Sequence, residues 1–171
     1  MYTLDVKDIR KIEYMINFMG LSTKIRYADD ITARLMEDKS TGGSYIVPLD
    51  MIIYRPDNLT PAAVFHELGH AYDYYLDPNR DRDPLSSETE AFYLGYKLLR
   101  KFHNLEWEFA YLLDTCVEVF AGDFELYTRA ANLALIRLRE EGYIDKIGLD
   151  ILREEIFSMP LEATLRLWLV I

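Results

Sequence analysis

The sequence predicts a mainly helical α+β fold, with a small β-sheet early in the chain and a helical region toward its C-terminal end. Two short apolar runs, Tyr45–Val47 and Met51–Tyr54, follow the Gly42-Gly43 turn signal and favour a pair of strands in a hairpin or meander. After Pro61, apolar residues recur at helical spacing in segments separated by glycine and proline. Strands are therefore few and precede most of the helices.

The first predicted helix covers residues 5–19. Ile9, Ile12 and Ile16 recur there at helical spacing, and Gly20 marks the end of the helix. The whole chain of 171 residues fits a single domain, because no linker, repeat or low-complexity tract interrupts it.

A second helix is predicted from Pro61 to about Leu76. Thr60 suits the N-cap, and proline is tolerated at the first helical position because that N–H has no intrahelical acceptor. The Asp77-Pro78-Asn79 segment breaks the helix. Four residues at helical spacing are expected to face the core: Val64, Leu68, Ala71 and Tyr75.

The next helix is predicted to start at Ser86 or Ser87, after a charged, proline-bounded loop. Residues 104–171 are rich in helix formers and form the helical C-terminal part. The run Leu161–Ile171 is apolar nearly all round. We expect it to be either buried or part of a homodimer interface.

Composition excludes several classes of function. The formal charge of −10 argues against a nucleic-acid partner, because phosphate contacts need a basic face. Cys116 is the only cysteine, so the chain has no internal disulfide. Met1–Arg10 contains no apolar signal-peptide core, and no apolar run is long enough to cross a membrane. A cytoplasmic protein without a membrane partner is therefore expected.

The second helix carries the pattern HExxH, here His66-Glu67-Leu68-Gly69-His70. Histidines four residues apart lie one turn apart on the same helix face, so both imidazoles can bind one Zn²⁺ ion. Glu67 directly follows the first ligand and can act as general base toward an activated water. The alternative is that the two histidines only form hydrogen bonds on a partly buried helix. The helical context of the motif favours the metal.

A third ligand must come from elsewhere, because zinc sites are built from at least three protein side chains. Glu88 and Glu90 both lie at the start of the next helix. Glu90 precedes an apolar face and is the predicted ligand, with a capping box formed by Ser87 and Glu90 as the alternative. His103, the remaining histidine, is expected at or near the surface.

The stretch from Val64 to Tyr75, followed by Glu90-Ala91-Phe92-Tyr93, resembles the gluzincin metallopeptidases, including the anthrax lethal factor type and the ImmA/IrrE-like peptidases. The resemblance implies a zincin-like minimal domain whose catalytic core spans residues 43–103 approximately. It also implies that a strand before the motif, here Met51–Tyr54, pairs with an extended substrate.

The sequence departs from the gluzincin pattern at two places. Leu94 stands where many gluzincins have an aspartate bound to a zinc histidine, so Asp73 is either the orienting residue or a solvated helix residue. Asp83 stands where the lethal factor type has a tyrosine that steadies the oxyanion. Five tyrosines are possible substitutes: Tyr72, Tyr74, Tyr75, Tyr93 and Tyr96.

The predicted function is that of a zinc metalloendopeptidase with a protein or peptide substrate. His66, His70 and Glu90 hold the metal, and Glu67 is the catalytic base. The alternative is a zinc-binding regulatory or interaction domain without proteolytic activity. The presence of Glu67 favours hydrolysis, because a purely structural site has no use for a base beside an open coordination position.

Overall fold

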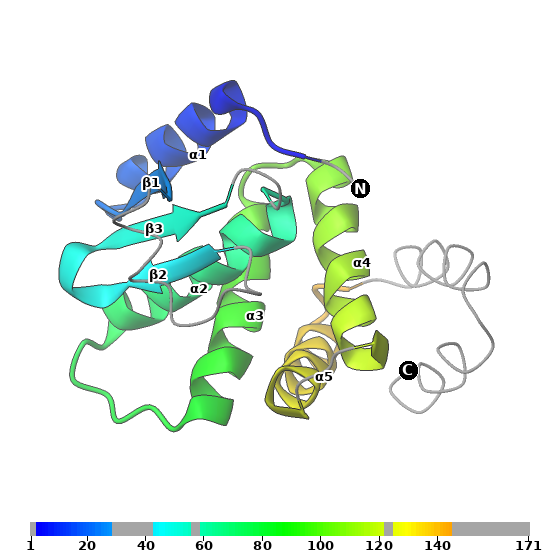
Figure 1. Cartoon of the computed structure of the whole chain (residues 1–171). Coiled ribbons are helices and arrows are strands. Elements are labelled where there is room, and N and C mark those ends of the chain that lie inside the picture. Colours follow the sequence, from blue (N-terminus) through cyan, green and yellow to red (C-terminus); the bar gives the residue numbers. More distant parts are fainter. Residues whose placement is uncertain (1–2, 29–42, 56–58, 122–124, 145–171) are drawn as a thin grey trace.

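The computed structural model describes residues 3–28, 43–55, 59–121 and 125–144 (Figure 1). These residues form a mainly helical α+β fold, as predicted. The elements follow in the order α1 (Val6–Phe18), β1 (Lys24–Tyr27), β2 (Gly43–Ile46), the short 3₁₀ helix η2 (Val47–Leu49), β3 (Met51–Tyr54), α2 (Pro61–Leu76), α3 (Pro84–Arg100), α4 (Leu105–Ala121) and α5 (Glu125–Glu140).

The first two helices begin where local capping chemistry predicts. Asp5 and Asp8 form a capping box at the start of α1, each side chain accepting a hydrogen bond from the other's backbone N–H. At the start of α2, the Thr60 hydroxyl accepts a hydrogen bond of 3.1 Å from the Ala63 amide, and Pro61 occupies the first helical position. Both predicted helices are thus confirmed.

The sheet has three strands in the order β1-β3-β2. β2 and β3 are antiparallel, with Tyr45 opposite Ile52, which confirms the predicted strand pair. They are joined by η2 and by Asp50, whose positive φ of 44° is tolerated by a short polar side chain. β1 lies parallel to β3 on its other side, with Ile25 opposite Ile52.

The strand Met51–Tyr54 is central, and this corrects the expectation that it pairs with a substrate. Both of its edges are taken, one by β1 and the other by β2. Since a fourth strand can join only at an edge, Met51–Tyr54 has no free backbone groups to offer. In the sheet formed by the described residues, the edge strand beside α2 is instead β2, Gly43–Ile46 (Figure 1).

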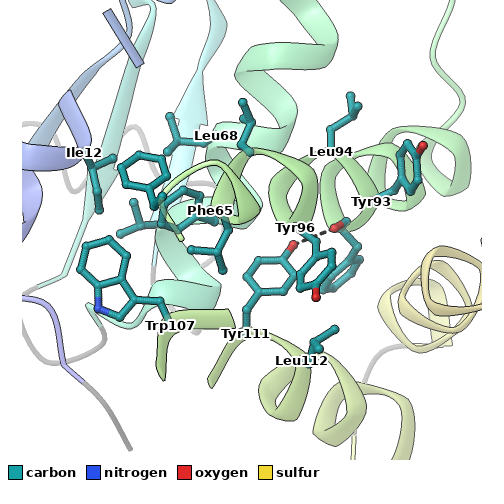
Figure 2. Close-up of a cluster of buried hydrophobic side chains, with 14 of the residues drawn as sticks. Ile12, Phe65, Leu68, Tyr93, Leu94, Tyr96, Trp107, Tyr111 and Leu112 are labelled. Atoms are coloured by element: carbon teal, nitrogen blue, oxygen red, sulfur yellow. Dashed lines mark hydrogen bonds between the residues drawn. The ribbon is translucent and has the colours of Figure 1, made fainter. Parts of the chain in front are cut away.

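One hydrophobic core joins the sheet and all five described helices. Figure 2 shows its centre, where Phe65 and Leu68 of α2 meet aromatic residues of α3 and α4. Trp107 and Tyr111 are each 1% exposed, and the Tyr111 hydroxyl donates a hydrogen bond of 2.8 Å to the Phe92 carbonyl. The face of α2 opposite the metal motif is therefore held rigidly.

Helix α3 folds back antiparallel to α2 with almost no space between the two backbones. A Cβ atom on Gly69 would lie 2.1 Å from the Ala91 carbonyl oxygen, and one on Gly95 would lie 2.3 Å from the Phe65 carbonyl oxygen. Only glycine fits at both positions. Two glycines thus set the distance between the helices that carry the predicted ligands.

Among the described residues, no helix combines the length and the apolar character that a membrane span requires. The apolar run Leu161–Ile171, for which a homodimer interface is predicted, lies outside the described residues.

Candidate metal centre

The two motif histidines lie one turn apart on α2, on the side that faces α3. Their ring centroids are 4.9 Å apart, with the rings nearly perpendicular. The His66 side chain is 14% exposed and that of His70 is 19% exposed. Both imidazoles therefore lie in a partly buried site with access from solvent, as the spacing of the motif predicts.

Glu88 of α3 completes the cluster. Its Oε2 atom lies 3.1 Å from the His66 Nε2 atom and 3.4 Å from the His70 Nε2 atom. Two ligands of a tetrahedral zinc ion with bonds of about 2.0–2.1 Å are separated by about 3.3–3.4 Å. All three ligand atoms lie within 4.8 Å of one another. The nitrogen and oxygen donors and their spacing therefore fit a zinc ion.

The structure does not bring Glu90, the predicted third ligand, to this cluster. Its Oε1 atom accepts a hydrogen bond of 2.7 Å from the Arg137 guanidinium on α5. Side chains two residues apart on an α-helix point in directions that differ by about 200° around the helix axis. Glu88 and Glu90 therefore point to opposite sides of α3. Glu88 faces α2, and Glu90 faces α5.

The capping alternative for Glu90 is wrong, because α3 begins earlier than predicted. The helix starts at Pro84, and the side chain of Asp83 accepts the hydrogen bond from the Ser86 amide. Asp83 is therefore an N-cap, in the position where lethal-factor-type enzymes have a tyrosine. The earlier start also places Glu88 in the second turn of the helix.

The electrostatics of the cluster reflect the pairing of one carboxylate with two imidazoles. Burial alone would raise the pKa of Glu88, but the hydrogen bonds and charges of His66 and His70 outweigh burial and lower it to about 2. Burial disfavours the charged form of His70, yet the hydrogen bond with Glu88 and the charges of Glu67 and Asp73 raise its pKa. Glu88 is thus an ionised carboxylate, the form that binds a cation.

The Glu67 side chain extends toward the edge of the sheet. Its Oε2 atom accepts a hydrogen bond of 2.7 Å from the backbone N–H of Tyr45 on β2. A Cβ atom on Gly43 would lie 3.4 Å from the Glu67 Cγ atom, so the side chain runs along this edge. The predicted base therefore lies between the metal cluster and the edge strand.

Asp73 neither orients a histidine nor lies in solvent, so both predictions for it are wrong. The residue is 4% exposed, and its carboxylate binds the guanidinium groups of Arg80 at 3.0 Å and Arg82 at 2.5 Å. Next to the imidazoles, the Ser87 hydroxyl lies 3.5 Å from the His70 Nδ1 atom. The His66 Nδ1 atom is buried without a hydrogen-bond partner among the described residues.

The remaining candidates lie elsewhere. His103 is exposed at the end of α3 and has a positive φ of 51°. Tyr93 donates its hydroxyl hydrogen to Glu141, the residue directly after α5, and Tyr72 stacks on Tyr75 with ring centroids 6.2 Å apart. In this arrangement the Tyr93 hydroxyl is bound to Glu141 and is not placed to stabilise an oxyanion.

Sequence reasoning did not predict three features of the candidate site: Glu88 beside the two histidines, Tyr45 as the partner of Glu67, and β2 as the edge strand of the described sheet. The first depends on which side of α3 packs against α2. The other two depend on the order of strands in the sheet.

Comparison with family models, curated proteins and solved structures finds no match for this chain.

Proposed function

We propose that the protein is a zinc-dependent metalloprotease that hydrolyses peptide bonds. The observation that carries the proposal is the convergence of the His66 and His70 Nε2 atoms on the Glu88 carboxylate, at 3.1 and 3.4 Å. This donor set and spacing suit a catalytic zinc ion, which typically has three protein ligands and one open position. The resemblance of the motif to gluzincins agrees with it, with Glu88 in place of Glu90.

His66, His70 and Glu88 would hold the ion. Zinc, when bound, supplies Lewis-acid chemistry, because it polarises a carbonyl group and makes water more acidic. Glu67 takes the proton from the attacking water and passes it to the leaving amine. Its place next to His66 in the sequence keeps it close to the metal without making it a ligand.

A protein or peptide substrate would bind in extended form along β2. This strand is an edge of the described sheet and lies against the helix that carries the motif. Edge strands bind extended chains through their free backbone groups. The amide of Tyr45 points away from β3, because it donates to Glu67.

A second candidate function is a zinc-binding interaction domain that does not cleave its partner. The hydrogen bond between Tyr45 and Glu67 is the observation that favours it, since it gives the glutamate a use in holding the sheet against α2. The two functions differ in one respect that can be measured, which is whether Glu67 is needed for a reaction.

The test compares the wild type with Glu67→Gln and, as a matched control, Glu106→Gln at an exposed position of α4. Each protein is loaded with zinc and incubated with a library of unstructured peptides, and cleavage is followed by mass spectrometry. Removal of the base should lower the rate about 10²- to 10⁴-fold, with zinc content unchanged. Cleavage by Glu67→Gln at the wild-type rate contradicts the mechanism, and zinc binding without cleavage by the wild type supports the interaction domain.

A further inference from the structure

The loop between α2 and α3 is held by an ion cluster centred on the buried carboxylate of Asp73. Asp73 lies on α2, three residues beyond His70, and both of its carboxylate oxygens bind arginine side chains from the loop. The Arg82 guanidinium also donates to two backbone carbonyls, those of Asp73 at 2.8 Å and Asp77 at 2.5 Å. The end of α2 and the loop therefore form one rigid unit.

Arg80 extends this unit to the helix that carries Glu88. Its Nη1 atom donates to the Asp73 carboxylate at 3.0 Å, and its Nη2 atom donates to the Ser86 hydroxyl at 2.7 Å. Ser86 lies in the first turn of α3, and its own amide donates to the Asp83 side chain. A continuous chain of hydrogen bonds thus runs from a point three residues after His70 to a point two residues before Glu88.

We propose that Asp73, acting through Arg80, is a positioning residue for the metal centre, which sets the Glu88 carboxylate against the two imidazoles. The inference rests on the proposed metal site. Arg80 is suited to this role because a guanidinium has several donors in a fixed planar fork, so it can bind both partners at once in one geometry. A lysine at the same position keeps the charge but has a single nitrogen.

Stabilisation of the fold does not by itself explain why this junction is built from charged side chains. Asp73 is nearly inaccessible, and burying a carboxylate with its cationic partners incurs a desolvation cost that often equals the Coulombic gain. Apolar residues of similar size would stabilise the same junction as well or better. An ion cluster adds geometric definition, and it does so here at the junction between two helices that share one metal site.

The experiment measures metal affinity and coordination geometry rather than activity. Zinc binding is titrated against a competing chelator, and the visible absorption of the Co²⁺-loaded protein reports the geometry at the metal. Three variants break the hydrogen-bond chain at successive points: Asp73→Asn, Arg80→Lys and Ser86→Ala. Ile12→Val is the control, because it removes a methylene from a fully buried residue far from the loop and costs about 1 kcal/mol of stability.

Groups that orient metal ligands typically change affinity about tenfold to a hundredfold when they are mutated. Asp73→Asn and Arg80→Lys are expected to weaken zinc binding to that extent and to alter the Co²⁺ spectrum, while Ile12→Val changes neither. Ser86→Ala, which leaves the buried charges paired, is expected to give a smaller loss in the same direction. This variant serves as the test if Asp73→Asn does not fold.

Two negative results have different meanings. Zinc affinities of Arg80→Lys and Ser86→Ala within twofold of the wild type, with an unchanged Co²⁺ spectrum, overturn the positioning role and leave the metal centre intact. A wild-type protein that binds neither ion overturns the metal centre itself, and the positioning role with it.

Discussion

The backbone N–H of Tyr45 donates a hydrogen bond of 2.7 Å to the Glu67 carboxylate. This contact joins the edge strand of the sheet to the residue of α2 that we propose as the catalytic base. An extended chain that pairs with β2 needs the same N–H group, so it competes with Glu67 for the bond. Substrate binding along this edge would therefore release the carboxylate.

Hydrogen exchange at the Tyr45 amide tests this contact. Glu67→Ala removes the acceptor, so exchange is expected to accelerate about tenfold to a hundredfold, which corresponds to a net charge-assisted bond of about 1.5–3 kcal/mol. Glu67→Gln keeps an acceptor oxygen and should retain most of the protection. Amides of the central strand β3, measured by NMR in the same samples, are the internal control. Equal exchange of the Tyr45 amide in Glu67→Ala and the wild type would show that the bond is absent in solution.

Glu88 and Glu90 provide a matched pair for the metal site. Glu88→Ala is expected to reduce bound zinc well below one ion per chain, because it removes one of three ligands. Glu90→Ala should keep the zinc and lower the stability by less than about 1 kcal/mol, because it removes a partly exposed ion pair with Arg137. Elemental analysis of the purified proteins measures the first effect, and denaturant unfolding measures the second.

The double variant His66→Ala, His70→Ala is the negative control for zinc content, because no imidazole remains at the site. The ligand set proposed here fails if Glu90→Ala loses more zinc than Glu88→Ala, or if the double variant retains stoichiometric zinc.

The variant Gly69→Ala tests the contact between α2 and α3, the two helices that carry the proposed ligands. In Gly69→Ala the new methyl group would lie 2.1 Å from the Ala91 carbonyl oxygen, so α3 must move away from α2. We expect a loss of about 1–3 kcal/mol in the free energy of unfolding, together with weaker zinc binding because Glu88 moves with α3. Unfolding by denaturant and zinc titration measure the two effects separately.

Gly142→Ala is the control for this comparison. Gly142 has a positive φ of 74° but open space around it, so alanine there strains the backbone far from the metal site. It should lower stability by about 1–2 kcal/mol and leave zinc affinity unchanged. A Gly69→Ala protein that binds zinc as tightly as Gly142→Ala would refute the proposed dependence on helix spacing.

Asp50 makes stability depend on pH. Burial would raise the pKa of its carboxyl group, but hydrogen bonds from Thr23, Ser22 and Tyr45 outweigh burial and lower the pKa below its ordinary value of 3.8. A depressed folded-state pKa stabilises the protein above the unfolded-state value, and the effect is lost as the pH falls through the folded-state value. Asp50→Asn should therefore be less stable than the wild type at pH 7, with a difference that shrinks below about pH 4.

Asparagine tolerates the positive φ at this position, so the comparison isolates the charge. Urea unfolding at pH 7 and pH 3 measures the difference, with Asp81→Asn at an exposed loop position as control. A stability difference that is the same at both pH values would exclude the carboxylate as its source.

The parts of the fold and site that sequence predicts correctly depend on local rules. The helical period brings His66 and His70 together whatever surrounds them, and Thr60 and Pro61 define the start of α2 through bonds within one turn. Tyr75 shows the limit of such rules. It falls on the apolar stripe of α2, yet it is 56% exposed in the last turn of the helix.

The parts that the sequence does not predict depend on how elements meet. Glu88 and Glu90 differ only in the side of α3 on which they lie, and the partner on each side, α2 or α5, comes from elsewhere in the chain. The central place of Met51–Tyr54 depends on β1, whose pattern Lys24-Ile25-Arg26-Tyr27 carries little apolar signal. The sequence leaves Asp73 either as an orienting residue or as a solvated helix residue, because the ion pairs with Arg80 and Arg82 depend on how the loop folds.

Arg137 of α5 and Glu141, the residue directly after α5, bind α3 and lie 47 and 48 residues after their partners Glu90 and Tyr93. The three proposed metal donors, by contrast, all belong to the helical hairpin of α2 and α3, within 22 residues of one another. A growing chain emerges from its N-terminal end, so this hairpin leaves the ribosome before the helix that covers its far side. All residues of the proposed centre are therefore synthesised before the helix that packs on the far side of α3.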